Sequence, residues 1–312
     1  MLVVGRREIE AVLDLGSIAP AIEQAFIAAS AGEIELPPVG HITFPEVDGD
    51  CHIKFGHRRG DPDFVIKVAA GFPQQAASGA PTGNGLSLVV SAETGQIRAV
   101  LHDEMLLTDV RTGIGGAVAT RLLARPDAVR LLVVGTGVQA RHQIEAHVAL
   151  LDRALEVSVW GRSLDAAARV VADVEPTVGA AVASDLREAC AEADIIVTCT
   201  SATVPLVLSD WIRPGCHITA VGADAPGKHE LDPQLLRRAD LVVADSRAQC
   251  LDHGELSAVA GEAELESPPL EIGDILAGSI GRRHSDDVTI ADLTGTAAQD
   301  IAIARYVLDA LT

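Results

Sequence analysis

Continuous apolar segments alternate with amphipathic segments through the second half of the chain. The pattern predicts strands at residues 131–134, 155–160, 195–199, 217–221 and 241–244, and helices at 138–151, 164–174, 185–192, 232–238 and 254–260. Short apolar runs separated by helices are typical of parallel strands joined by crossover helices. A doubly wound parallel sheet is therefore expected, with a further strand at 288–291 and a terminal helix at 297–311.

The N-terminal part of the chain has a different pattern. An amphipathic helix is expected at 18–32, closed by Gly32, and strands are expected at 52–56, 64–69, 86–91 and 96–102. The last two strands flank Ala92-Glu-Thr-Gly95, a hairpin turn with glycine where a positive φ is needed. Asp103 is a candidate cap for a long helix that ends near Leu123.

Together these patterns predict an α/β protein with a Rossmann-type parallel sheet and an N-terminal α+β domain. We expect a substrate and dimerisation domain at 1–115, completed by residues from about 292 to 312, and a dinucleotide-binding domain at 116–291. The terminal helix should pack back on the N-terminal domain. An exposed acidic loop is expected at 262–269.

Composition excludes several classes of protein. With 48% apolar and 22% charged residues, the chain is globular, and its net charge of −20 argues against nucleic acid and anionic membranes as partners. We find no apolar run of membrane length and no leader pattern, so a cytoplasmic location is expected. The five cysteines form no CxxC pair or zinc pattern, so we predict reduced thiols and no metal site.

One segment indicates a dinucleotide site. The strand at 131–134 runs into Gly135-Thr136-Gly137-Val138-Gln139-Ala140 and then into a helix. The first glycine permits the turn, the second lets the backbone approach a pyrophosphate, and Ala140 lets helix and strand pack closely. The free N–H groups of the helix start would bind the anion, and the flanking strand and helix are the context that this motif requires.

The next strand suggests which dinucleotide is bound. An NAD-selective protein places Asp or Glu at the tip of this strand, on the ribose 2′-hydroxyl. Here the strand leads to Gly161, Arg162 and Ser163, which offer room, a planar cation and a hydroxyl. This favours NADP(H). NAD(H) stays possible if Arg162 is a surface residue that stacks on adenine.

Three residues are candidates for chemistry. Lys67 interrupts an apolar strand, so it either faces water or meets an anion, because burying an unpaired ammonium is costly. Arg111 could hold a carboxylate through a bidentate pair, or be an ordinary exposed helix residue. Asp224 follows a parallel strand at its carboxyl end, where it could carry protons or make local hydrogen bonds.

The chain resembles the ornithine cyclodeaminase/mu-crystallin family. The resemblance rests on six segments in order: Ile66-Lys-Val68 with Gly71-Phe-Pro73, Thr94-Gly95, Leu107-Thr108 with Arg111-Thr112, the segment 135–140, Gly222-Ala-Asp-Ala-Pro-Gly-Lys228, and Asp292-Leu-Thr-Gly295 with Asp300. The resemblance implies a homodimer associated through the N-terminal sheet domain. It also implies hydride transfer between nicotinamide and the α-carbon of a small amino acid or its cyclic imine.

The resemblance also implies roles for individual residues. Lys67 and Arg111 would hold the substrate carboxylate, and Asp224 would be the acid/base at the amine or imine. Thr112 and Gln139 would lie near the cofactor phosphates. We expect further cofactor contacts at Thr200, Ser201, Val221 and Gly222.

Four activities stay open at this point: cyclodeaminase, ketimine reductase, amino-acid dehydrogenase, and NADPH-dependent ligand binding without catalysis. Two departures from the family pattern count against ornithine itself. Val39 follows Pro37-Pro38 where cyclising members often have arginine, and Gln74-Gln75 stands where they tend to have asparagine. Arg58 or Arg59 could replace the missing cation. Substrate specificity is expected in the loops at 57–63 and 262–272.

Overall fold

The computed structural model describes residues 1–261 and 269–312, so most of the predicted loop at 262–269 lies outside the described residues. The chain forms two compact units. The first unit contains Met1–Arg111 and Thr296–Thr312, and the second contains Thr112–Gly295. Helix α3, Leu106–Leu123, carries the chain from one unit into the other.

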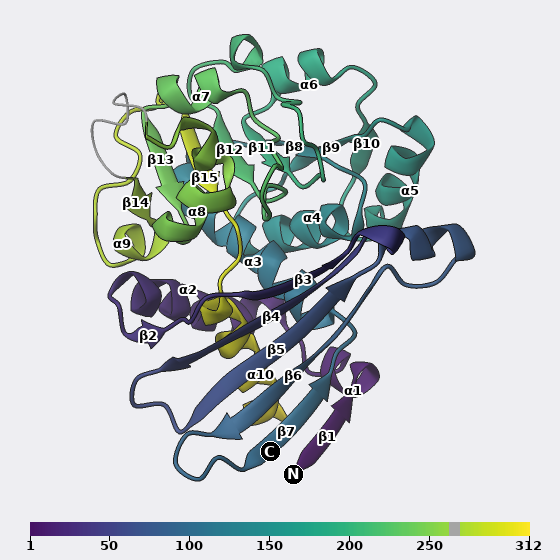
Figure 1. Ribbon diagram of the computed structural model, residues 1–312. Coiled ribbons are helices and arrows are strands. Elements are labelled where there is room, and N and C mark those ends of the chain that lie inside the picture. Colours follow the sequence, from purple (N-terminus) through teal and green to yellow (C-terminus); the bar gives the residue numbers. More distant parts are fainter. Residues whose placement is uncertain (262–268) are drawn as a thin grey trace. The chain divides into compact units, whose positions relative to one another are not determined.

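The first unit is built on a mainly antiparallel sheet, which Figure 1 shows as long, nearly aligned strands. Its strand order is β1-β7-β6-β5-β4-β2, with β3 paired to β4. The strands are β1 Leu2–Gly5, β2 Ile34–Glu35, β3 Gly40–Phe44, β4 Gly49–Arg58, β5 Asp63–Gly71, β6 Gly83–Ser91 and β7 Ile97–His102. The turn between β6 and β7 has Gly95 at φ +70°, as predicted.

Helices α1 Arg6–Glu10, α2 Leu15–Ser30 and α10 Ala297–Leu311 belong to this unit, with 3-10 turns at Pro45–Val47 and Pro73–Ser78. Helix α2 begins three residues before the predicted start, because the Asp14 carboxylate caps it by accepting from Ser17 N at 2.8 Å. The terminal helix α10 packs on α2, β4 and β5, which confirms that it returns to the N-terminal sheet.

The second unit is the predicted doubly wound sheet. Eight parallel strands lie in the order β10-β9-β8-β11-β12-β15-β13-β14. Their bounds are β8 Arg130–Val134, β9 Glu156–Trp160, β10 Ala180–Val182, β11 Ile195–Thr198, β12 His217–Ala220, β13 Leu241–Ala244, β14 Leu270–Glu271 and β15 Thr289–Asp292. Fully buried apolar side chains such as Leu132, Ile196 and Ile218 make its core.

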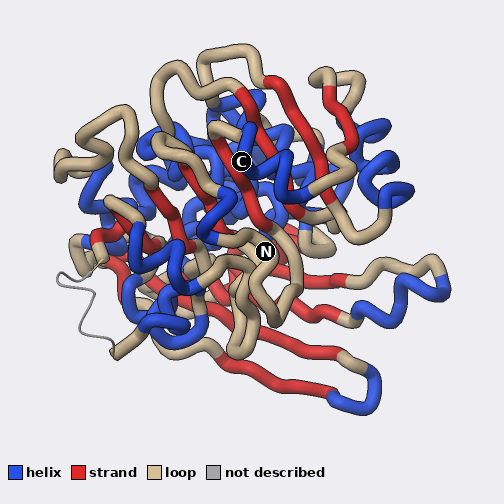
Figure 2. Tube along the Cα trace, turned by 90° about the horizontal axis from the view of Figure 1, so that it is seen from above, coloured by secondary structure: helices blue, strands red, loops and turns tan. Residues whose placement is uncertain are grey.

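A helical segment stands between each of these strands and the next, drawn in blue in Figure 2. The segments are α4 Val138–Leu150, α5 Leu164–Val174, α6 Leu186–Glu192, η3 Ser209–Trp211, α7 Pro233–Arg238, α8 Arg247–His253, η4 Glu255–Val259 and α9 Ile272–Leu276. The helix predicted at 254–260 is wrong. Ser246 caps α8 instead, and residues 255–259 form a 3-10 turn after it.

Among the described residues, no helix combines the length and the apolar character needed to cross a membrane. The described cysteines are all reduced, and three of the five are buried.

Candidate functional site

The glycine turn of the second unit has the geometry of an anion cradle. Gly135 has a φ of +140°, and a Cβ there would lie 2.7 Å from Cys199 Sγ, so only glycine fits. Gly137 is the N-cap of the 13-residue helix α4, and nothing lies within 4 Å of where its Cβ would be. Ala140 is fully buried against the sheet. A pyrophosphate can therefore approach the helix N-terminus closely.

Strand β8, which leads into this turn, lies at the point where the sheet changes direction. Its neighbours are β9 on one side and β11 on the other, so the chain winds away from it both ways. Ligands of doubly wound sheets bind at this switch point, outside the carboxyl ends of the strands. Thr200 and Ser201 follow β11, and Val221 and Gly222 follow β12, so these predicted contacts lie at that same edge.

A buried carboxylate not singled out from the sequence shapes this edge. The Glu230 side chain accepts hydrogen bonds from Thr198 Oγ1 at 2.7 Å, Thr200 N at 2.6 Å and Gly222 N at 2.8 Å. A Cβ on Gly222 would collide with Thr200 O and with this carboxylate. Glu230 therefore ties the ends of β11 and β12 together.

The tip of β9 carries the residues predicted to select the cofactor. A Cβ on Gly161 would collide with Thr136 Cγ2, so the glycine lets this loop and the glycine turn meet. Arg162 is exposed, and the Ser163 hydroxyl caps α5 by accepting from Ala166 N at 3.2 Å. Among the three, Arg162 has the side chain best placed to meet a ligand from solvent.

The other predicted cofactor contacts lie in the first turn of α4 and in α3. Val138 is half exposed and Gln139 is partly buried. The Thr112 carbonyl accepts from Gln143 Nε2 at 3.1 Å, which links α3 to α4 within the second unit.

Asp224 lies in the loop after β12, with its side chain 53% exposed. Its Oδ1 is 2.5 Å from Lys228 Nζ. Both alternatives for this residue remain, because an exposed carboxylate in a local ion pair can still exchange protons with a bound ligand.

In the first unit, Lys67 is buried, at 5% exposed, and its Nζ lies 2.7 Å from Asp300 Oδ2. It shares the inward face of β5 with Val65 and Ala69. The solvated alternative for this lysine is wrong, and the anion it meets is on α10.

Arg111 meets the same carboxylate. Its Nε donates to Asp300 Oδ1 at 3.0 Å and its Nη1 donates to Gln299 Oε1 at 3.3 Å, with 5% of the residue exposed. The exposed-helix alternative is therefore also wrong. Gln299 belongs to the capping box of α10, accepting from Thr296 N at 3.2 Å, so the start of that helix is what positions the guanidinium. We name Lys67, Arg111 and Asp300 the carboxylate-centred cluster.

Burial dominates the electrostatics of this cluster. It lowers the pKa of Lys67 from 10.5 to about 7, against the attraction of Asp300. Burial acts to raise the pKa of Asp300, but the two cations outweigh it and hold this pKa below its usual value. Lys67 and Arg111 thus share one ionised carboxylate, and the buried carboxyl group of Asp103, whose pKa burial raises, also interacts with Lys67 and Asp300.

Asp300 had no predicted role, although it belongs to one of the six family segments. The available signal was an acidic residue in the first turn of the terminal helix, which also suits the helix dipole. That signal does not indicate which residue Asp300 contacts, because Asp300 and Arg111 are 189 residues apart in the sequence.

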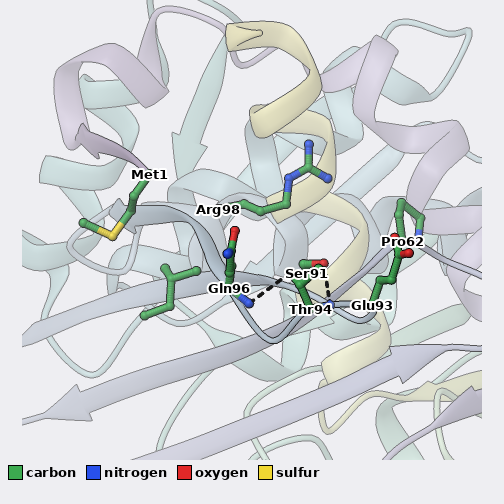
Figure 3. A pocket seen from close by; sticks show the side chains of 8 residues that line it. Met1, Pro62, Ser91, Glu93, Thr94, Gln96 and Arg98 are labelled. Carbon is green, nitrogen blue, oxygen red and sulfur yellow. Dashed lines mark hydrogen bonds between the residues drawn. The ribbon is translucent and has the colours of Figure 1, made fainter.

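A separate hollow beside the β6–β7 turn contains none of these residues (Figure 3). It is lined by Met1, Pro62, Ser91, Glu93, Thr94, Gln96, Ile97 and Arg98. Ser91 Oγ accepts from Thr94 N at 3.2 Å, and Thr94 Oγ1 accepts from Gln96 N at 3.4 Å. The family segment Thr94-Gly95 is therefore a turn-forming element.

Comparison with known proteins gives matches over the whole chain. A Delta(1)-pyrroline-2-carboxylate reductase of Paracoccus denitrificans is 35% identical over 249 residues, covering 78% of both chains. The structure of the Thermococcus litoralis enzyme of that name, in complex with NADH and L-proline, matches with a TM-score of 0.92 at 26% identity. It covers 99% of this chain and 97% of its own.

An archaeal alanine dehydrogenase dimer with bound NAD matches with a TM-score of 0.90 at 31% identity, covering 99% of this chain and 95% of its own. The profile of the ornithine cyclodeaminase/mu-crystallin family matches residues 1–312. A match over this full length, in agreement with the six segments and both sheets, establishes that the chain belongs to the ornithine cyclodeaminase/mu-crystallin family.

Proposed function

We propose that this protein is a nicotinamide-dependent reductase of small imino acids. The observation that carries the proposal is the buried pair of cations, Lys67 and Arg111, which share the single carboxylate of Asp300. A substrate carboxylate can join such a cluster through charge-assisted hydrogen bonds. Imino acids and amino acids carry the carboxylate that this arrangement binds.

The cofactor residues present fit a dinucleotide. Gly135, Gly137 and Ala140 leave the space that a pyrophosphate needs at the start of α4. When bound, the nicotinamide supplies or accepts a hydride at the substrate α-carbon. The exposed guanidinium of Arg162 would bind a 2′-phosphate, so we propose that NADP(H) is preferred and NAD(H) is accepted.

In this proposal, Asp224 carries the proton at the substrate nitrogen. Its carboxylate is accessible, and Lys228 keeps it oriented within the loop. Lys67 and Arg111 fix the carboxylate, and Asp300 keeps both cations in place. The protein therefore orients the imine and transfers one proton to its nitrogen.

We also propose a homodimer that forms through the first unit. The face of its sheet opposite Lys67 exposes large apolar side chains, among them Ile42, Phe44, Ile53 and Phe55. A row of apolar residues on the open face of a sheet is typical of a subunit interface. The cyclodeaminase alternative is less favoured, because a cation-rich site repels the terminal ammonium of a diamino acid.

The test is the absorbance of reduced nicotinamide with NADPH or NADH and the cyclic imines pyrroline-2-carboxylate and piperideine-2-carboxylate. Loss of absorbance is expected, faster with NADPH. Asp224→Asn should abolish turnover while cofactor affinity stays nearly unchanged. No oxidation with any imine, combined with ammonia release from diamino acids, would identify a cyclodeaminase instead.

A further inference from the structure

Lys54 stands directly opposite Lys67 on the neighbouring strand. The antiparallel register of β4 and β5 pairs the two lysines, and Ser87 of β6 pairs with Lys67 on its other side. Residues paired in this way point to the same face of a sheet, with Cβ atoms about 5 Å apart. Lys54 therefore belongs to the face that carries the carboxylate-centred cluster.

This pairing places like charges side by side, which is unfavourable unless an anion lies between them. The charge of Lys54 contributes to lowering the pKa of both Lys67 and Asp300. Three cations, Lys54, Lys67 and Arg111, thus act on Asp300. A substrate with one carboxylate would bind Lys67 and Arg111, and Lys54 is a further cation on the same face.

Small residues and one carboxylate lie farther along this face. Beyond Lys54, β4 presents His52 and Asp50, while the neighbouring positions on β5 and β6 are the small residues Ala69 and Gly85. Asp50 Oδ2 lies 3.7 Å from the His41 ring and 3.8 Å from the His52 ring. The carboxylate at this end therefore lies beside two imidazole rings.

The predicted substitutes for the missing family arginine are engaged elsewhere. Arg58 Nη2 donates to Glu33 Oε2 at 3.2 Å, and Arg59 donates to the Gly32 carbonyl. Lys54 is the cation that the register brings beside Lys67.

We propose that Lys54 forms a second anion subsite, so that the substrate is a short imino acid with two carboxylates. This inference rests on the proposed function and specifies its substrate class. One carboxylate binds Lys67 and Arg111, and the other binds Lys54. The imine carbon receives the hydride of NAD(P)H, the imine nitrogen receives a proton, and an amino dicarboxylic acid and NAD(P)+ leave.

The experiment compares acids that differ by one carboxylate. Oxaloacetate and 2-oxoglutarate, against pyruvate and 2-oxobutyrate, are titrated calorimetrically into the full-length protein saturated with NADP+. The same acids are then assayed with ammonium and NADPH. The dicarboxylic acids should bind at least about tenfold more tightly, which is the affinity change of one charge-assisted contact.

Lys54→Met should remove that advantage and leave binding of the monocarboxylic acids within about twofold. Arg58→Met is the matched control, because it removes a cation from the same strand and should change neither. Equal binding of both classes by the unaltered protein would overturn the inference. So would an equal loss for both classes in Lys54→Met, which would make Lys54 a third ligand of the same carboxylate.

These outcomes separate the inference from the proposed function. Selective binding of dicarboxylic acids without NADPH oxidation supports the second subsite and contradicts the reductase. Turnover of cyclic imines with one carboxylate, without any preference for two, supports the reductase and overturns the second subsite.

Discussion

Replacing Asp300 by asparagine should be the most informative change in the first unit. The substitution keeps the size of the side chain and removes the carboxylate that Lys67 and Arg111 share. Removing one partner of a buried ion pair costs about 3–5 kcal/mol, because the remaining charge is left in the interior. Lys67 can escape part of this penalty by losing its proton, since its pKa is already lowered to about 7.

Because Lys67 can lose its proton, the loss of stability in Asp300→Asn depends on pH. Lys67 has a pKa of about 7 in the folded protein and an ordinary value of 10.5, so the unfolded state binds more protons between these values. Stability from this group therefore rises with pH across that window. In Asp300→Asn the pKa of Lys67 in the folded state falls further, so the pH range over which stability rises extends below pH 7. Each unit of that fall adds about 1.4 kcal/mol to the loss of stability on the acid side.

The assay is urea unfolding followed by circular dichroism near pH 6 and near pH 9, at one protein concentration. We expect Asp300→Asn to lose about 3–5 kcal/mol near pH 6 and at least about 1 kcal/mol less than that near pH 9. Asp309→Asn is the control, because it makes the same change at an exposed position of the same helix. A loss equal to that of the control at both pH values would refute the buried charge cluster.

Four other predictions concern the second unit. Arg162→Ala should raise the KM for NADPH about tenfold to hundredfold and leave that for NADH within about twofold, as measured by initial rates, if the guanidinium binds a 2′-phosphate; equal changes would exclude this role. Gly135→Ala should destabilise the fold by about 1–3 kcal/mol in urea unfolding, since its Cβ would lie 2.7 Å from Cys199 Sγ. Gly137→Ala should leave stability within about 1 kcal/mol yet weaken cofactor binding in a calorimetric titration; unchanged affinity would reject close backbone approach. Burial raises the pKa of Glu255 from 4.5 to about 9, so the contribution of Glu255 to stability falls as pH rises between those values. Glu255→Gln should therefore reduce the decline of the unfolding free energy with pH, as measured by unfolding curves at several pH values. An unchanged decline would contradict a buried, protonated Glu255.

The sheet of the second unit could be predicted from local pattern because its strands are short, apolar and separated by helices. The strand predicted at 241–244 and the helices predicted at 164–174 and 297–311 have the observed bounds. Strand β3 was not predicted, because all five of its residues are exposed and give no burial pattern. Helix α8 was missed because its start depends on the Ser246 cap, while the apolar residues that suggested a helix follow it in a 3-10 turn.

The glycine motif could be interpreted from the sequence because each of its requirements is local. A positive φ, an open helix N-terminus and a close helix–strand contact all arise within a few residues of Gly135. The chemistry of Lys67 could not be settled in the same way. Its environment depends on α10, which is the last element of the chain, so the strand sequence allowed both a solvated and a paired lysine.

The last family segment, residues 292–295 with Asp300, explains how Asp300 is positioned. Asp245 Oδ2 accepts from Gly295 N at 2.6 Å, and Asp292 Oδ2 accepts from Leu256 N at 2.9 Å, so buried carboxylates fix the chain as it leaves β15. The capping box at Thr296 then starts α10, and one helical turn later Asp300 meets two cations. In the second unit, the carboxylate of Asp292 stabilises the fold through hydrogen bonds. In the first unit, the carboxylate of Asp300 pairs with the charges of Lys67 and Arg111. A role for Asp300 therefore follows from two contacts, one at each oxygen of its carboxylate, which neither the sequence spacing nor the family resemblance predicts.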